Sequence, residues 1–361
     1  MFYYNETTKN IFRTRFDAVV DSEPCLFYFF DKEFSQVNWQ QNPTKSLSTL
    51  YLERAQHIRQ DYEYVILAYS GGHDSSQVLE TFYYNNIHID EILLVGAFSQ
   101  DSSSDSDENH NKEIYLQALP TLNKFHLPNT KVTQVDYTTY FNDINNFKLI
   151  EQYGSDWTKH IGSYYSVHNL FWNNLKRFVG ETNDKKTAVV FGGEKPNFQI
   201  HSVLGFAYTQ FDDNSITSYG NFQKNENFNR INFFTSLETT ELMRKQLHLI
   251  LKFYIEKVVI DKSITHEFFL KYYTEIIHKI IYNLKCPITY KSRKSSNNVL
   301  SLRDQYIVKD KNTPIYKIYQ DGIKHMKDIK NFMKEIPKNS FTPSTNFVTR
   351  TYRLSESLWT I

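Results

Sequence analysis

The middle of the chain alternates short apolar runs with amphipathic segments. Residues 64–69 (Tyr-Val-Ile-Leu-Ala-Tyr) are almost wholly apolar, which is typical of a strand buried on both faces. Strand-like runs recur three times, at 91–98, 131–137 and 187–192. Helical spacing recurs between them, at about 75–84, 110–125 and 164–179. This alternation predicts an α/β fold with a parallel, doubly wound sheet, whose strands all end at one edge.

The flanking parts have a different pattern. Residues 46–60 predict a helix with Ser46 as its N-cap, and 26–30 predict a short strand. Two apolar stripes at helical spacing occupy 236–285, and a helix near 316–334 precedes an irregular end. We therefore divide the chain into three predicted parts: an N-terminal extension (1–60), an α/β domain (61–235) and a mainly helical C-terminal region (236–361).

Composition excludes several classes of protein. The 361 residues are 40% hydrophobic and 22% charged, as in ordinary globular proteins. The formal net charge of +1 does not indicate nucleic acid as a partner, although a local basic patch stays open. Two cysteines cannot build a disulfide framework or a four-cysteine zinc site, and they favour a reducing, cytoplasmic setting. No apolar run approaches the ~20 residues of a membrane span, so no membrane partner is expected.

One segment carries candidate chemistry. Ser70-Gly71-Gly72-His73-Asp74-Ser75-Ser76 follows the first predicted strand and opens a helix. Two glycines let backbone N–H groups approach an anion, and the helix N-terminus adds further donors. The hydroxyls of Ser70, Ser75 and Ser76 are also donors, and Asp74 could hold a divalent cation against phosphates. The segment lacks the lysine of a Walker loop. A turn that merely caps the helix is the alternative interpretation.

This segment resembles the pyrophosphate loop of the ATP pyrophosphatase superfamily (PP-loop, adenine nucleotide alpha hydrolase-like). The family pattern Ser-Gly-Gly-x-Asp-Ser is matched at every fixed position, by Ser70, Gly71, Gly72, Asp74 and Ser75. The resemblance covers roughly residues 60–200 and points to an asparagine-synthetase-like or unassigned member. It implies that ATP and Mg²⁺ bind here, with adenine against the backbone near Ala68 and Gly96. It also implies an activity: transfer of AMP to a carboxylate or carbonyl oxygen, with release of pyrophosphate.

The resemblance extends to two weaker candidate groups. The turn Gly192-Gly193-Glu194-Lys195 ends the fourth predicted strand. There Gly193 is expected near the nucleotide, Glu194 is expected to ligate Mg²⁺ together with Asp74, and Lys195 to contact phosphate. A plain strand-end turn is the alternative, since the usual Asp-Glu pair is missing. Among Arg244, Lys245 and His248 in the helical region, Lys245 is the expected catalytic cation beside Asp74; a solvated basic face is the alternative.

The expected function is therefore an AMP-forming ligase or amidotransferase-like enzyme acting on a small-molecule or nucleoside acceptor. Glutamine-using asparagine synthetases have a catalytic cysteine where this chain has Phe2. An ammonia donor or a separate glutaminase is then the expected nitrogen source. Two alternatives stay open: an enzyme that modifies tRNA or nucleosides at the same ATP site, and a non-catalytic nucleotide-binding protein. We expect the acidic segment Asp101–Glu108 to be a mobile loop over the active-site edge.

Overall fold

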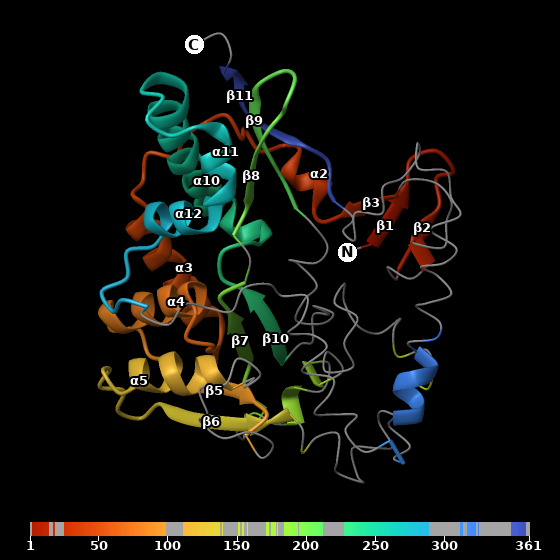
Figure 1. The fold of residues 1–361 in the computed structure, drawn as a ribbon. Coiled ribbons are helices and arrows are strands. Elements are labelled where there is room, and N and C mark those ends of the chain that lie inside the picture. Colours follow the sequence, from red (N-terminus) through yellow and green to blue (C-terminus); the bar gives the residue numbers. More distant parts are fainter. Residues whose placement is uncertain are drawn as a thin grey trace.

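A parallel β-sheet forms the centre of the protein (Figure 1). The computed structural model describes residues 2–13, 25–98, 111–137, 184–193, 195–211, 227–288 and 348–358, with shorter pieces inside 17–18, 139–179 and 311–324. The five strands are all parallel and have the order β10-β7-β4-β5-β6. Their bounds are Tyr64–Ala68 for β4, Glu91–Gly96 for β5, Lys131–Asp136 for β6, Thr187–Phe191 for β7 and Phe228–Asn232 for β10.

Both faces of the sheet are apolar. Side chains alternate between the two faces along a strand, so a strand with consecutive apolar residues supplies both of them. Val65 and Leu67 of β4 belong to one core, whereas Ile66 belongs to the other, with Trp157 and Phe171. The first core is covered by helices, which lie to the left of the sheet in Figure 1. They are α3 (Leu47–Asp61), α4 (His73–Tyr84), the π-helical turn η1 (Ile114–Ala118) and α5 (Leu119–Leu122). The four predicted strands are thus confirmed, and so is the α/β class.

The strand order contains a switch point. After β4 the chain builds β5 and then β6 on one side, and afterwards returns to place β7 on the other side of β4. In doubly wound sheets, ligands bind in the crevice at the carboxyl ends of the two strands that flank such a point. Here those ends carry the turn after Ala68 and the turn after Phe191.

Several elements differ from the sequence prediction. The helix expected at 110–125 is present between 112 and 122, but it is shorter and contains the π-helical turn η1, which continues directly into α5. The helix expected at 164–179 and the acidic segment 101–108 lie mostly or wholly outside the described residues. Strand β10 was not predicted, because Asn229, Arg230 and Asn232 interrupt its apolar pattern.

The N-terminal part forms a small antiparallel sheet of its own. It has the order β2-β1-β3 and is followed by a short helix, α2. The bounds are Phe2–Asn5 for β1, Ile11–Phe12 for β2, Cys25–Tyr28 for β3 and Asp31–Phe34 for α2. The strand expected at 26–30 is therefore present, shifted by one residue at its start, and the helix expected at 46–60 is α3.

The C-terminal part is helical between 237 and 281, as predicted. It consists of η4 (Leu237–Thr239), α10 (Thr240–Tyr254), η5 (Ile255–Ile260), α11 (His266–Lys271) and α12 (Tyr273–Ile281). The expected irregular end is wrong, since Tyr352–Ser357 form strand β11. This strand pairs with β9 (Phe206–Gln210), which pairs with β8 (Asn197–Ile200). One apolar cluster includes residues from all three predicted parts, from Tyr3 to Leu358. Among the described helices, none is long and apolar enough to cross a membrane.

Candidate functional site

The two glycines of the loop after β4 have different structural roles. Gly71 has φ +84°, and a Cβ on it would stand 2.8 Å from the Ala118 backbone. Folding alone therefore requires glycine there. Gly72 is the N-cap of α4, with φ −73° and ψ 170°, a conformation open to any residue. The nearest atoms to a Cβ on Gly72 are side-chain oxygens of Glu113 and Ser70, both at 3.4 Å. Packing does not require glycine at this position.

Serine hydroxyls hold the loop in shape from inside. The Ser75 hydroxyl accepts a hydrogen bond from the Ser70 N–H at 3.3 Å and donates to the Gly72 carbonyl at 3.2 Å. The Ser76 hydroxyl donates to the Gly71 carbonyl at 3.4 Å. Ser75 and Ser76 are both buried. The side that remains accessible is formed by Ser70, Gly72 and the first turn of α4, where Gly72 offers no capping side chain. Helical N–H groups without intrahelical partners occur in this first turn.

The turn after β7 touches this loop through its backbone. A Cβ on Gly192 would stand 2.6 Å from the carbonyl carbon of Asp74 and from the nitrogen of Ser75. Gly193 packs equally closely on the end of β10, because a Cβ there would lie 2.4 Å from Asn232 Oδ1. The prediction that these turns share one edge is thereby confirmed for Gly192 and Gly193. Glu194 lies outside the described residues.

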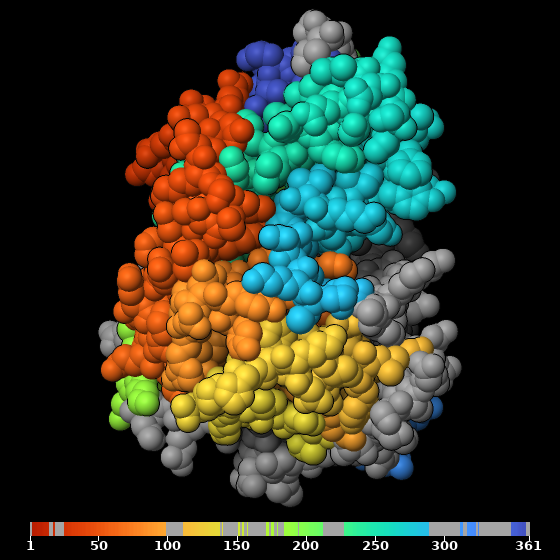
Figure 2. Space-filling view, turned by 90° about the vertical axis from the view of Figure 1, so that its left-hand side faces the viewer, coloured from red at the N-terminus to blue at the C-terminus, as the bar shows by residue number. Residues whose placement is uncertain are grey.

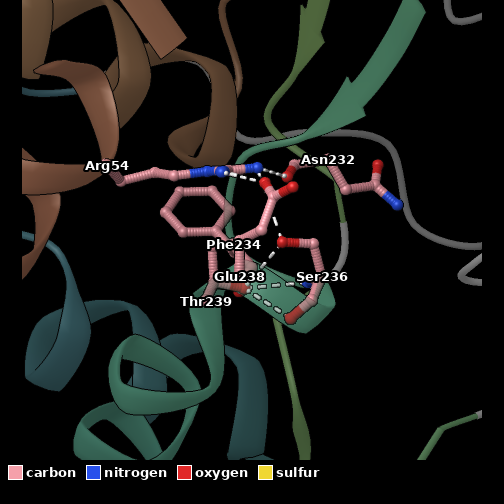
Figure 3. A network of polar contacts seen from close by, with 6 residues as sticks. All are labelled: Arg54, Asn232, Phe234, Ser236, Glu238 and Thr239. Atoms are coloured by element: carbon pink, nitrogen blue, oxygen red, sulfur yellow. Dashed lines mark hydrogen bonds and ion pairs between the residues drawn. The ribbon is translucent and has the colours of Figure 1, made fainter. Parts of the chain in front are cut away.

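A buried arginine fixes the end of β10 next to Gly193 (Figure 3). Arg54 of α3 is 5% exposed and donates to the Asn232 carbonyl at 3.2 Å and to Glu238 at 2.8 Å. Ser236 and Thr239 cap the next helical turn reciprocally. The network therefore ties α3, the end of β10 and the start of η4 together, and gives the sheet edge a rigid support.

The Asp74 carboxylate is held by two donors from distant parts of the chain. Its Oδ1 accepts from Lys195 Nζ at 3.4 Å and also from the Tyr282 hydroxyl. Lys195 follows β7, and Tyr282 follows α12. The side chain of Lys195 is 13% exposed and that of Asp74 is 35% exposed. Lys195 thus reaches the loop as the sequence analysis expected, whereas the contribution of Tyr282 was missed.

Two histidines stack beside Asp74. The rings of His73 and His278 have centroids 4.1 Å apart. Burial, reinforced by the charge of Lys195, lowers the pKa of His278 to about 3. Burial also lowers the pKa of His73, against the opposing effect of Asp74. Both imidazoles are therefore neutral at pH 7 and add no positive charge beside Asp74.

The segment after α12 is attached along α4. Gln77 accepts from the Asn283 N–H at 3.1 Å. Glu80, which is 3% exposed, accepts from the N–H groups of Lys285 at 2.7 Å and of Cys286 at 2.8 Å. In Figure 2 the end of α12 and the following residues, in cyan, lie across α4, in orange. These bonds bring the C-terminal region to the loop, and no local pattern in the sequence marks them.

The basic group on α10 makes its described contacts elsewhere. Lys245 Nζ donates to the Pro43 carbonyl at 2.9 Å, and Arg244 donates to the Asn38 carbonyl at 3.1 Å. His248 Nε2 lies 2.9 Å from the Trp39 carbonyl. The three side chains anchor the segment before α3. Lys245, the expected catalytic cation, is thus bonded to Pro43, and the lysine that contacts Asp74 is Lys195.

Part of the backbone expected to bind adenine is already hydrogen-bonded to a side chain of the protein. Ala68 and Gly96 end the neighbouring strands β4 and β5, as expected. A Cβ on Gly96 would stand 2.7 Å from Asn111 Oδ1. The same Asn111 accepts from the Ala97 N–H at 2.7 Å and donates to the Ala97 carbonyl at 3.0 Å. Any adenine contact with the Ala97 peptide would have to replace Asn111, so Ala68 and Gly96 stay the predicted contacts.

The residues around the loop supply too few ligands for a cation unless phosphate oxygens complete its coordination. Among the described residues, no group of three or more histidine, cysteine, aspartate or glutamate side chains could hold a metal ion. Mg²⁺ commonly takes one or two carboxylates and completes its octahedron with phosphate oxygens and water. Asp74 and the nearby Glu113 carboxylate are negative groups at the loop. A phosphate beside them would need a cation in between, so these residues would suit Mg²⁺ only as part of a nucleotide complex.

A scan of the chain against models of known protein families finds no match, and a search of curated proteins finds none either. The loop after β4 and the residues around it are therefore the features that bear on function.

Proposed function

We propose that this protein is an ATP-dependent, AMP-forming ligase or amidotransferase-like enzyme. In this proposal it binds ATP and Mg²⁺ at Ser70–Ser76, transfers AMP to a carboxylate or carbonyl oxygen, and releases pyrophosphate. The proposal takes its reaction class from the resemblance to the PP-loop superfamily. Its location at the β4–β7 switch point of a parallel sheet agrees with where doubly wound folds bind their ligands.

The observation that carries the proposal is Gly72. Neither its backbone conformation nor its packing calls for glycine. A residue without a side chain at the accessible start of a helix is instead suited to close approach by an anion. Gly71 and Gly192, by contrast, are explained by close packing. The loop thus contains one glycine that close packing does not require, at an N-cap position open to an anion.

The described residues suggest how the leaving group would be bound. Backbone N–H groups at the start of α4 would donate to the pyrophosphate oxygens, and Lys195 would add a positive charge from the turn after β7. Donors that are already oriented stabilise the charge that develops on a leaving group. Asp74 would hold Mg²⁺, which neutralises phosphate charge when bound. Ser75 and Ser76 would keep the loop closed rather than contact ATP, since their hydroxyls are engaged within it.

Product analysis tests the reaction class. The full chain is incubated with Mg²⁺ and ATP labelled at the α-phosphate, together with a panel of small carboxylates, ammonia and RNA. AMP and pyrophosphate, formed in equal amounts with one acceptor, are the expected products. ADP and phosphate as the sole products would overturn the proposal. Tight ATP binding without turnover under any of these conditions would favour the non-catalytic alternative.

A further inference from the structure

Both donors to the Asp74 carboxylate bind the same oxygen. Lys195 Nζ and the Tyr282 hydroxyl converge on Oδ1. Within the described part of the chain, no donor is recorded for Oδ2. A carboxylate held through one oxygen has a fixed plane, and its second oxygen is presented in a defined direction. Asp74 is in the first turn of α4, at the accessible side of the loop.

The position of Tyr282 is set by the fold and does not depend on Asp74. Its ring lies against Phe234, with centroids 5.9 Å apart, and against His278, with centroids 5.3 Å apart. The preceding carbonyl, of Ile281, accepts from the Tyr51 hydroxyl at 2.9 Å. The following N–H, of Asn283, donates to Gln77. The hydroxyl is therefore brought to Asp74 by packing on both sides of it.

We propose that Tyr282 is a positioning residue for a divalent cation at Asp74: its hydroxyl fixes Oδ1, so that Oδ2 faces the cation bound with the nucleotide phosphates. The inference rests on the proposed function, since it assumes nucleotide at this loop. It adds a specific role for the C-terminal region, which supplies no direct ligand but orients one. Carboxylates that bind metals are commonly hydrogen-bonded in this way, and removal of such a partner typically weakens metal binding ~10–100-fold.

Tyr282→Phe separates the hydroxyl from the ring. The phenyl group keeps the ring contacts with Phe234 and His278, and the hydrogen bond to Asp74 is lost. We expect the Mg²⁺ concentration needed for half-maximal nucleotide binding to rise ~10-fold or more. Nucleotide binding in EDTA should stay unchanged, because the phosphate-binding N–H groups are untouched. A purely structural role for Tyr282 would weaken both kinds of binding together.

The experiment uses the full chain and an ATP analogue with a methylene bridge between the α and β phosphates. Calorimetric titrations are run over a range of Mg²⁺ concentrations and in EDTA. Tyr254→Phe is the matched control, since it loses a hydroxyl bonded to His266 in the same C-terminal region and not to Asp74 or to the residues next to Tyr282. It should retain the wild-type Mg²⁺ dependence. In an Asp74→Asn background, Tyr282→Phe should cause no further change in the Mg²⁺ dependence. Tyr282 acts on the cation only through the Asp74 carboxylate, which is then already absent.

The outcomes separate this inference from the proposed function. If the wild-type protein binds the analogue with Mg²⁺, and Tyr282→Phe leaves the Mg²⁺ dependence unchanged, the positioning role is rejected and the nucleotide site stands. Tighter Mg²⁺ binding in Tyr282→Phe would also reject it, since the hydroxyl would then compete with the cation. If the wild-type protein binds no analogue under any condition, the proposed function fails and this inference with it.

Discussion

Gly192 lies so close to Ser75 that a Cβ on the glycine would stand 2.6 Å from the serine nitrogen. The turn after β7 and the loop after β4 therefore pack backbone against backbone. We expect Gly192→Ala to destabilise the protein by about 1–3 kcal/mol, because an overpacked site forces neighbouring backbone to move. Urea unfolding followed by fluorescence measures the change. Stability equal to wild type would show that the two turns separate easily and do not form one rigid edge.

Gly72→Val tests the accessible side of the same loop. The backbone conformation is open to valine and its Cβ meets no atom nearer than 3.4 Å, so we expect a loss of about 1 kcal/mol in the free energy of unfolding, as for a changed N-cap. ATP binding should nevertheless be lost, since the new side chain stands where a phosphate would approach the backbone. Calorimetry measures the affinity and urea unfolding measures the stability. Unchanged ATP affinity in a folded Gly72→Val protein would reject this site.

Asp74→Asn removes the charge and keeps the size of the side chain. We expect the variant to fold normally, because the carboxylate is at the surface of α4 and is 35% exposed. The AMP-forming reaction should be lost and Mg²⁺ should no longer strengthen ATP binding, since a neutral amide is a poor ligand for Mg²⁺. A product assay at several Mg²⁺ concentrations measures both. Wild-type turnover by Asp74→Asn would remove this residue from the proposed metal site.

The central sheet could be predicted because its physical cause is local. A run such as Val65-Ile66-Leu67 is apolar at consecutive positions, and a strand that is covered on both faces buries every one of these side chains. Strands β10 and β11 were not predicted because they lack such a continuous apolar run. β10 lies at the edge of the central sheet and β11 at the edge of a small antiparallel sheet, so polar residues such as Arg230 and Arg353 are tolerated in them.

The candidate site also has a part that could be predicted from the sequence and a part that could not. The loop from Ser70 to Ser76 is contiguous, so its chemistry can be read from the sequence. Tyr282 and His278 reach it across about two hundred residues of chain, and no local motif marks either residue. Lys245 shows the converse: the sequence indicated a ligand contact for a basic group on a helix, whereas in the structure its ammonium donates to the carbonyl of Pro43.

The two lysines can be separated by parallel substitutions. Lys195→Met should weaken ATP binding strongly and AMP binding little, since Lys195 lies at the loop expected to bind the β- and γ-phosphates. Lys245→Met should leave both affinities unchanged and lower the thermal midpoint, because it removes a bond that anchors the segment before α3. Calorimetry with ATP and AMP, combined with thermal unfolding, distinguishes the two. Loss of ATP binding in Lys245→Met alone would restore the catalytic role that the sequence suggested.

The stacked histidines predict a loss of stability in mild acid. Burial lowers the pKa of His278 to about 3, whereas a histidine in the unfolded chain has a pKa of about 6.5. As the pH falls below that value, the unfolded chain takes up a proton that the folded protein does not, so unfolding becomes more favourable. The thermal midpoint should therefore decrease between pH 7.5 and pH 5.5. His278→Gln should make this decrease smaller, while His126→Gln, at an exposed position, should leave it unchanged. An equal decrease in wild type and in His278→Gln would show that His278 is not the group responsible.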